Sequence, residues 1–353
     1  MKKIIAAMSG GVDSSVCAIL LKDSGYDVTG VTLRLFERNE TEKKCGTQKE
    51  IDDAKNVCEK LGIPHFVYDY KDDFEKNVIE KFVVAYENGQ TPNPCVDCNR
   101  EVKFKTVLKS AEDNGIELIA TGHYANVEYD EKKGRYLLKK AKDERKDQTY
   151  FLYKLTQKEL SKTLFPLGEI SDKEEVRKIA LKNGLSVADK ADSQDICFIS
   201  EKSYIEFIEK YRNKKYKKGN FVNTDGKILG EHQGIINYTV GQRKGLGISF
   251  SKPMYVVGKN KEKNEVVLGE EKDLFSKELQ IKDVNLIFFE DIKEPVRVNA
   301  KIRYNKDGQP ATLTKISNDR YKVEFEEPQR AVTSGQACVF YIDEYVVGGG
   351  TII

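Results

Sequence analysis

The feature that most constrains the fold is a glycine- and serine-rich segment near the N-terminus, Ser-Gly-Gly-Val-Asp-Ser-Ser at residues 9–15. It follows an apolar run at residues 3–8, which predicts a buried strand, and precedes an amphipathic run at residues 13–24, which predicts a helix. Two adjacent glycines let the backbone approach an anion closely, and the amides at a helix start face that anion. A capped helix after a tight turn would use the same residue types. Because the segment follows the first strand, we interpret it as a phosphate loop.

Apolar strand-like runs and amphipathic helix-like runs alternate over roughly the first 200 residues. The pattern predicts strands at residues 3–8, 27–33, 65–70 and 117–121, and helices at residues 13–24, 48–61, 71–88 and 103–114. This alternation is typical of α/β proteins in which helices cover both faces of a doubly wound parallel sheet.

The pattern changes after about residue 199. One more helix is predicted at residues 203–211, and short strands separated by turns then dominate, at residues 254–257, 265–268, 296–302, 321–325 and 337–342. Many short strands with regular turns predict a small antiparallel β-barrel or sandwich. At roughly 150 residues per domain, 353 residues suggest two or three domains. We place them at residues 1–205 (a catalytic α/β domain), 206–275 (a central module) and 276–353 (a C-terminal β-barrel).

Charge and cysteine content narrow the class of protein. The 59 Lys and Arg residues nearly balance the 57 Asp and Glu residues, which excludes a uniformly basic nucleic-acid binder. Basic residues nevertheless cluster at residues 132–146 and 201–218. No apolar run is long enough to span a membrane, and the N-terminal apolar run is too short for a signal peptide, so we expect a cytoplasmic protein without membrane contact. Seven cysteines, an odd number, then favour functional thiols or a metal site over a disulfide framework.

Three of the cysteines stand in informative surroundings. Cys95 and Cys98 lie in a proline-containing stretch that predicts a loop over residues 91–100, followed by a helix from Lys103. A helix dipole would stabilise a thiolate there. Half of a zinc site is the alternative, although the chain has no second Cys-x-x-Cys. Cys197 stands between Ile196 and Phe198, where a buried small hydrophobe is the alternative to a reactive thiol.

The phosphate-loop segment resembles the SGGxDS motif of the PP-loop ATP pyrophosphatases, in which ATP is cleaved between its α and β phosphates and a substrate oxygen is adenylated. Over nearly its whole length the chain resembles the bacterial tRNA-specific 2-thiouridylases. The matching segments are AMSGGVDSS (7–15), residues 53–64, TPNP (91–94), CN (98–99), KF (103–104), TGHYA (121–125), KDQTYFL (146–152), SQDICF (193–198), YTVGQRKGLG (238–247), KIRY (301–304) and GGG (348–350).

The resemblance implies a mechanism. Uridine 34 in the anticodon stem-loop of tRNAs for Lys, Glu and Gln would be adenylated by ATP at its C2 oxygen, with Asp13 holding Mg²⁺ against the phosphates. A persulfide on Cys197, charged by a sulfur carrier or a cysteine desulfurase, would supply the sulfur. Cys98, the nucleophile, would either release hydrosulfide from the persulfide or close a disulfide with Cys197. The product would be 2-thiouridine.

The same resemblance assigns roles to further residues. ATP contacts are expected at Ala7, Met8, Ser9, Gly10, Gly11, Val12, Asp13, Ser14, Leu33 and Gly122. The target base is expected near Asn93, Pro94 and Cys95, and tRNA contacts at His123, Lys146, Asp147, Gln148, Arg303, Tyr304 and Gln336, with the central module also binding tRNA. The remaining cysteines, Cys17, Cys45, Cys58 and Cys338, are expected to have no role in the chemistry.

Three alternatives stay open at this point. Some relatives have an aspartate where this chain has Cys95, so Cys95, Cys98 and Cys197 could together ligate three irons of a [4Fe–4S] cluster. A PP-loop ligase acting on a small molecule would need neither Cys98 nor Cys197 nor a C-terminal barrel. A non-catalytic RNA-binding protein would have no use for Asp13.

Overall fold

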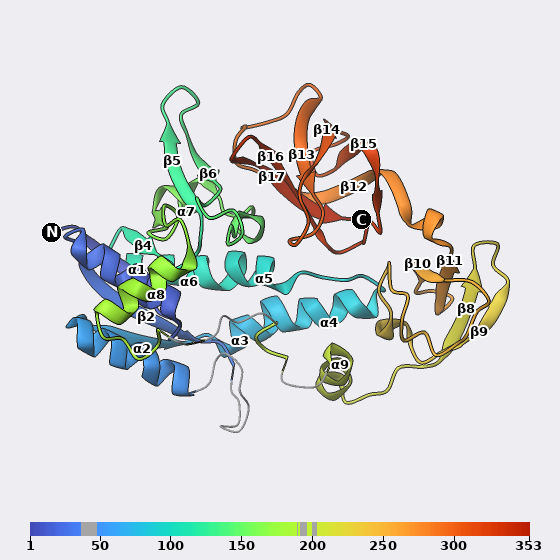
Figure 1. The fold of residues 1–353 in the computed structure, drawn as a ribbon, viewed down its shortest axis with the longest axis horizontal. Coiled ribbons are helices and arrows are strands. Elements are labelled where there is room, and N and C mark those ends of the chain that lie inside the picture. Colours follow the sequence, from blue (N-terminus) through green and yellow to red (C-terminus); the bar gives the residue numbers. More distant parts are fainter. Residues whose placement is uncertain (37–47, 189, 191–195, 200–202) are drawn as a thin grey trace.

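The computed structural model describes residues 1–36, 48–188, 190, 196–199 and 203–353 (Figure 1). Cys45 and residues 193–195 of the SQDICF segment lie outside the described residues. The described chain forms an N-terminal α/β part, a central β module and a C-terminal β-barrel, as the sequence predicted (Figure 1). No helix in these described ranges is long and apolar enough to cross a membrane.

The N-terminal part is built on a five-stranded parallel sheet with the strand order β3-β2-β1-β4-β7. Its strands are β1 (Lys3–Ala7), β2 (Asp27–Arg34), β3 (His65–Asp69), β4 (Leu118–Ala120) and β7 (Thr163–Leu164). The connecting helices include α1 (Val12–Asp23), α2 (Gln48–Leu61), α6 (Lys105–Asp113), α7 (Gln157–Ser161) and α8 (Lys173–Lys182), with a short helical turn, η3 (Thr149–Phe151), before α7.

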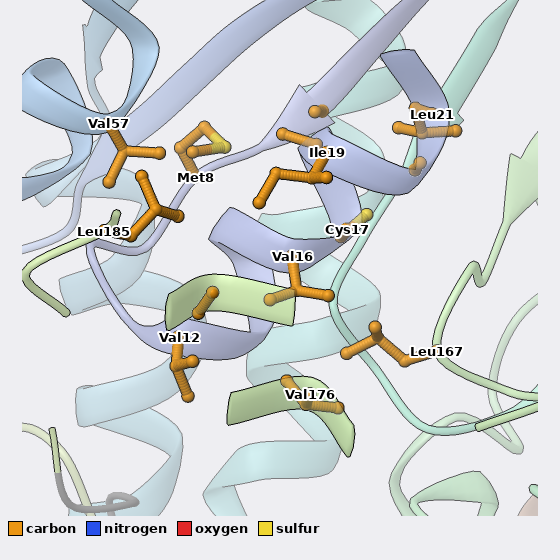
Figure 2. Close-up of a cluster of buried hydrophobic side chains, with 14 of the residues drawn as sticks. Met8, Val12, Val16, Cys17, Ile19, Leu21, Val57, Leu167, Val176 and Leu185 are labelled. Atoms are coloured by element: carbon orange, nitrogen blue, oxygen red, sulfur yellow. The ribbon is translucent and has the colours of Figure 1, made fainter. Parts of the chain in front are cut away.

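Helices cover both faces of this sheet because the side chains of β1 alternate between two buried clusters. Ile4 and Ala6 pack with residues of α1, α2 and α8, including Val16 and Val176, in the cluster shown in Figure 2. Ile5 packs into a second cluster with residues of α6 and with residues of the C-terminal barrel. The barrel therefore shares a core with one face of the parallel sheet.

Two long helical stretches lead away from the sheet. The first comprises α3 (Lys71–Phe74), the π-helical segment η1 (Glu75–Ile79) and α4 (Glu80–Glu87). The second comprises α5 (Pro94–Asp97), the π-helical segment η2 (Cys98–Phe104) and α6. The predicted loop over residues 91–100 is therefore wrong in its second half, because the helix begins at Pro94 and not at Lys103. A proline fits the first helical position, where its missing N–H would have no partner in any case.

The central module begins with α9 (Tyr204–Arg212) and continues as a four-stranded sheet with the order β10-β11-β8-β9. The strands are β8 (Gly219–Asn223), β9 (Ile228–His232), β10 (Tyr255–Asn260) and β11 (Glu265–Gly269), with short turns η4 (Ile235–Asn237) and η5 (Glu271–Leu274). Buried residues of this module share one cluster with α4 and η2.

The C-terminal part is a closed antiparallel barrel of six strands in the order β12-β15-β14-β13-β16-β17, and β12 also pairs with β17 to close it. The strands are β12 (Phe275–Leu286), β13 (Val296–Lys301), β14 (Gln309–Lys315), β15 (Tyr321–Arg330), β16 (Ala337–Ile342) and β17 (Tyr345–Ile352). A hairpin that sequence reasoning missed, β5 (Asn126–Asp130) and β6 (Arg135–Lys139), extends this sheet through one pairing of β6 with β17.

Candidate functional site

The phosphate loop connects β1 to α1 and is held by its own side chains. Gly10 adopts a φ of +71°, and a Cβ there would lie 2.3 Å from the carbonyl oxygen of Glu50. The Ser9 amide and hydroxyl each donate to Ser14 Oγ at 3.1 Å. The Ser15 hydroxyl donates to the Gly11 carbonyl at 2.8 Å. These contacts fix the shape of the loop.

The other expected nucleotide contacts gather at the same edge of the sheet. Gly122 follows β4 and lies against the start of α1, where a Cβ would be 2.8 Å from both Asp13 C and Ser14 N. Leu33 is near the end of β2, and the Met8 amide donates to Val31 O at 2.8 Å. Ligands of open α/β sheets bind outside the carboxyl ends of the strands, and this edge presents those ends.

Asp13 is bound by two groups that sequence reasoning did not assign. Its Oδ1 accepts hydrogen bonds from the Tyr124 hydroxyl at 2.7 Å and from Lys173 Nζ at 2.5 Å. The Lys173 side chain is only 13% exposed, whereas that of Asp13 is 32% exposed. Lys173 lies 160 positions after Asp13 at the first position of α8, so no local sequence signal could have revealed the pair.

A second lysine contacts the loop from the far end of the same region. Lys190 Nζ donates to the Gly10 carbonyl at 2.9 Å and to Asp53 Oδ2 at 2.8 Å. The phosphate loop is thus flanked by two ammonium groups, each paired with a carboxylate. An incoming polyphosphate would find two cations close to the loop amides.

Cys98 occupies the second turn of the helix that begins at Pro94, and it is 6% exposed. Burial raises the pKa of its thiol to about 11, against a smaller lowering by Lys103. Burial in this state therefore opposes the thiolate that the helix start was expected to stabilise. Cys95, at the second helical position, is exposed.

Cys197 lies in the same hydrophobic cluster as Cys98, although the two residues are 99 positions apart in the chain. Its neighbour Phe198 packs edge-on against Phe82 of α4, with 5.3 Å between ring centroids. Cys98 is buried and Cys197 is half-buried. The fold thus brings the two expected sulfur-handling residues into one cluster.

The other cysteines within the described residues are Cys17, Cys58 and Cys338, and all three are buried and free. Burial raises the pKa of Cys58 to about 12 and that of Cys17 and Cys338 further above the usual range. Such thiols are inert packing residues. In the part of the chain that the structure describes, no three Cys, His, Asp or Glu side chains come together to hold a metal ion. Within the described residues, Cys95, Cys98 and Cys197 are thus not gathered as one set of metal ligands.

The expected tRNA contacts after β4 form a hydrogen-bonded group that reaches the phosphate loop. The Tyr124 amide donates to Gln148 Oε1 at 3.0 Å, and the Gln148 amide donates to the Tyr124 carbonyl at 2.9 Å. The Asp147 side chain is buried and accepts hydrogen bonds from the Thr149 hydroxyl at 2.6 Å and the Ala141 amide at 3.1 Å. It shapes the turn in this structure instead of facing solvent, whereas Lys146 beside it is partly exposed.

The barrel contributes the remaining expected contacts. Arg303 donates to the Ala331 carbonyl at 2.7 Å, and the Tyr304 ring packs on Phe151 with 4.4 Å between centroids. Asn99, next to Cys98, donates to the Phe151 carbonyl at 3.2 Å. Gln336 Nε2 donates to the carbonyls of Thr91 at 2.8 Å and Pro92 at 3.3 Å, just before the helix that carries Cys98.

His123 is held uncharged by its surroundings, which predicts a pH effect on stability. Its Nδ1 lies 2.8 Å from the Thr121 hydroxyl, and burial lowers its pKa to about 3, with Lys103 adding to the shift. The unfolded chain binds a proton near pH 6.5 and the folded chain does not, so stability is complete above that pH and falls as the pH drops toward 3. Between pH 7.5 and 5.5 we expect this residue to account for a loss of about 1 kcal/mol in the free energy of unfolding.

The measurement is urea unfolding of the wild type and of His123→Asn at both pH values. His65 and His232 also have lowered pKa values and contribute equally to both proteins, so they cancel in the comparison. Equal pH dependence of the two proteins would contradict a buried, neutral His123.

Comparison with known proteins finds relatives that match this chain over essentially its whole length. Three family models match in succession: a tRNA methyl transferase HUP domain over residues 2–201, a tRNA methyl transferase PRC-barrel domain over residues 205–270 and an aminomethyltransferase beta-barrel domain over residues 276–352. The tRNA-specific 2-thiouridylase of Lachnoclostridium phytofermentans is 51% identical over 358 residues, which cover 100% of both chains. That of Acetivibrio thermocellus is 50% identical over 99% of both chains. That of Clostridioides difficile is 49% identical over 99% of this chain and 98% of the relative. The protein therefore belongs to the tRNA-specific 2-thiouridylase family.

Proposed function

We propose that this protein is an ATP-dependent tRNA sulfurtransferase that converts the wobble uridine of tRNA to 2-thiouridine. The observation that carries the proposal is the match at 49–51% identity, over essentially full length, to relatives named for that activity. The three-part organisation is consistent with it. Residues 1–205 would hold the nucleotide and both reactive thiols, and residues 206–275 and 276–353 would hold the tRNA.

The first chemical step is activation of the uridine C2 oxygen. That oxygen attacks the α phosphate of ATP, the bond between the α and β phosphates breaks, and pyrophosphate leaves from the loop at residues 9–14. Gly10 and the amides at the start of α1 would receive the phosphates. Lys173 and Lys190, which reach the loop from the second half of the domain, would neutralise charge on the departing pyrophosphate.

The Asp13 carboxylate is the group of this loop that would hold Mg²⁺. Asp13 presents a partly exposed carboxylate at the loop, and Mg²⁺ in such sites is commonly held by one or two carboxylates together with substrate phosphates. The ion would supply further charge neutralisation at pyrophosphate. The chain would then need to exchange Lys173 for the ion at Asp13, which frees the ammonium group for phosphate.

The second step is sulfur transfer. A sulfur carrier or cysteine desulfurase passes one sulfur atom to the Cys197 thiolate, which becomes a persulfide. In one order of events, the terminal sulfur of the persulfide attacks C2 of the uridine and AMP leaves. The Cys98 thiolate then attacks Cys197 Sγ, which breaks the S–S bond and leaves the sulfur on C2 as 2-thiouridine. In the other, Cys98 attacks the persulfide first and frees hydrosulfide, which then displaces AMP. Both orders leave a disulfide between Cys98 and Cys197, which an external thiol must reduce before the next turnover.

The raised pKa of Cys98 bears on the point in the reaction at which this thiol becomes a nucleophile. With a pKa of about 11 the thiol is protonated at neutral pH in this state, so its nucleophilic form must arise after the surroundings change. Substrate binding near Asn93, Pro94 and Cys95, at the start of the same helix, is the event that we propose triggers this change. Such an order protects the thiol from oxidation between turnovers. The proposal uses the persulfide route because Cys98 and Cys197 share one hydrophobic cluster, whereas the described residues gather no set of three metal ligands.

The tRNA would be held by residues from both ends of the chain. We propose direct contacts for His123, Lys146, Gln148, Arg303 and Tyr304, with tRNAs for Lys, Glu and Gln as substrates, in the cytoplasm. Basic residues of the β5–β6 hairpin and the loop after it, including Lys132, Lys133, Lys142 and Arg145, are exposed and suit the phosphate backbone. An uncharged His123 would contribute hydrogen bonding or stacking, not charge.

The test combines cells and purified protein. Nucleoside analysis of tRNA from cells lacking the protein should show loss of 2-thiouridine derivatives at position 34, and purified protein with ATP and a persulfide donor should restore them. ATP cleavage without sulfur in tRNA would favour a ligase acting on a small molecule. Binding of tRNA without any ATP cleavage would favour a non-catalytic RNA-binding protein.

A further inference from the structure

The segment that leads into the Cys98 helix is held by the C-terminal barrel. This connecting segment (residues 88–93) joins the end of α4 to the start of α5 and forms no helix or strand of its own. A barrel loop (residues 333–336), between β15 and β16, contacts it through backbone and side chains. The Thr91 amide donates to the Ser334 carbonyl at 2.9 Å, and the Gln90 side-chain amide donates to the Ser334 hydroxyl at 3.3 Å.

Gln336 makes the contact nearest to the helix. Its side-chain amide donates to the carbonyls of Thr91 and Pro92 at 2.8 and 3.3 Å, so one N–H₂ group joins two consecutive residues. The next residue is Asn93, the N-cap of α5, and its side chain makes no capping hydrogen bond. A helix start without a side-chain cap is prone to fray. The position of the first turn, which holds Cys95, and of Cys98 in the next turn therefore depends on contacts from outside the helix.

The barrel loop is itself firmly fixed. The Gly335 amide donates to the Ile352 carbonyl at 2.9 Å, and the Ile352 amide donates to the Gln336 carbonyl at 2.9 Å. Gly335 has a φ of +89°, and a Cβ there would lie 3.0 Å from Gln90 Cβ and 3.1 Å from Thr91 N. The close approach of the two segments thus requires glycine at this position. A loop held by β17 thus meets a segment that forms no helix or strand, although the Gln90 amide donates to the Ala85 carbonyl of α4 at 2.9 Å.

The packing of the connecting segment against the barrel loop leaves one polar group unsatisfied. The Thr91 hydroxyl is buried without a hydrogen-bond partner in the described part of the chain. A buried unpaired hydroxyl costs free energy that a second arrangement of the segment would recover.

We propose that Gln336 is a positioning residue that sets the start of the Cys98 helix from the barrel, and that this contact keeps Cys98 buried until tRNA is bound. The catalytic part of this proposal rests on the proposed function, whereas the structural part does not. tRNA phosphates or base edges offer acceptors for the same amide, so tRNA that reaches Gln336 would compete with Thr91 and Pro92 for it. Release of the connecting segment would then expose Cys98 at the moment when the substrate is present.

The structural part is tested without tRNA or ATP. In Gln336→Glu the side chain keeps its shape but cannot donate at neutral pH, so the contact is lost. We expect alkylation of Cys98 by iodoacetamide, followed peptide by peptide by mass spectrometry, to be about fivefold faster than in the wild type, as for loss of one hydrogen bond that opposes local opening. Gly335→Ala separates the same two segments but leaves the Gln336 side-chain amide unchanged. It should also increase the rate of Cys98 alkylation.

The matched control is Gln329→Glu, a change of the same kind in the barrel strand β15, where the side chain donates only to the nearby Glu327 carbonyl. Its Cys98 alkylation should equal that of the wild type. Thermal unfolding of all variants shows whether faster alkylation arises locally. If neither Gln336→Glu nor Gly335→Ala increases the rate of Cys98 alkylation above that of the wild type, the proposal is overturned.

The catalytic part is tested by steady-state thiolation. Because bound tRNA displaces the contact, its loss in Gly335→Ala predicts an unchanged kcat and a KM for tRNA no higher than in the wild type. A kcat lowered at saturating tRNA would overturn this part. If the wild type does not thiolate tRNA at all, the proposed function fails, and the alkylation result still decides whether Gln336 positions the helix.

Discussion

Replacement of Cys197 by serine should abolish sulfur transfer to tRNA, with a loss of about a thousandfold or more, while ATP cleavage and tRNA binding continue. A serine hydroxyl has nearly the shape of the thiol but cannot form a persulfide. Cys98→Ser should fall to a similar level, because the fold brings both residues into one hydrophobic cluster and both proposed orders of events require the two sulfurs. The readout is thiolated nucleoside per tRNA under single-turnover conditions, with ADP, AMP and pyrophosphate measured in parallel.

Two further cysteine variants make this result specific. Cys58→Ala removes a buried thiol on α2, outside the cluster of Cys98, and should retain sulfur transfer with only a lower thermal stability. Cys95→Ser removes an exposed thiol on the same helix as Cys98 and should reduce activity far less than either catalytic change. Equal loss in all three of Cys95→Ser, Cys98→Ser and Cys197→Ser would contradict the persulfide route and require the three thiols to act together.

Replacement of Lys173 by methionine should lower the rate of ATP cleavage by about 10²-fold. The Lys173 ammonium lies 2.5 Å from Asp13 Oδ1, in a side chain that is only 13% exposed, at the edge of the sheet where phosphates would bind. Methionine keeps the length and the packing of the chain but removes the charge. The measurement is pyrophosphate release with saturating Mg²⁺, together with calorimetric binding of pyrophosphate and of AMP. Pyrophosphate binding should weaken and AMP binding should not.

Lys178→Met is the matched control, because Lys178 is exposed on the same helix and the substitution is chemically identical. Lys178→Met should leave the binding of pyrophosphate and of AMP, and the rate of ATP cleavage, unchanged. A Lys173→Met protein that binds pyrophosphate as tightly as the wild type would show that this lysine serves only to neutralise Asp13, and the assignment to phosphate would be withdrawn.

Much of the architecture was predictable because its signals are local. The alternation of side chains in β1, with Ile4 and Ala6 on one face and Ile5 on the other, is what a parallel strand buried on both faces requires. Gly10 of the phosphate loop likewise meets a local requirement, a backbone φ of +71°. The start of the Cys98 helix was mispredicted because proline was interpreted only as a loop former, although it also suits the first helical position.

The sequence by itself determined strands β1 to β4 of the parallel sheet, the glycine-rich turn after β1 and the identity of the family, since each depends on residues that are neighbours in the chain or on motifs in a fixed order. Only the tertiary structure decided which charges reach Asp13 and Gly10, that Cys98 is buried with a raised pKa, and that Gln336 holds the segment before Asn93. These features join residues between 99 and 245 positions apart, and pairings at that separation depend on how the sheet, the helices and the barrel pack together. Burial, which sets the protonation of Cys98, exists only once that packing has formed.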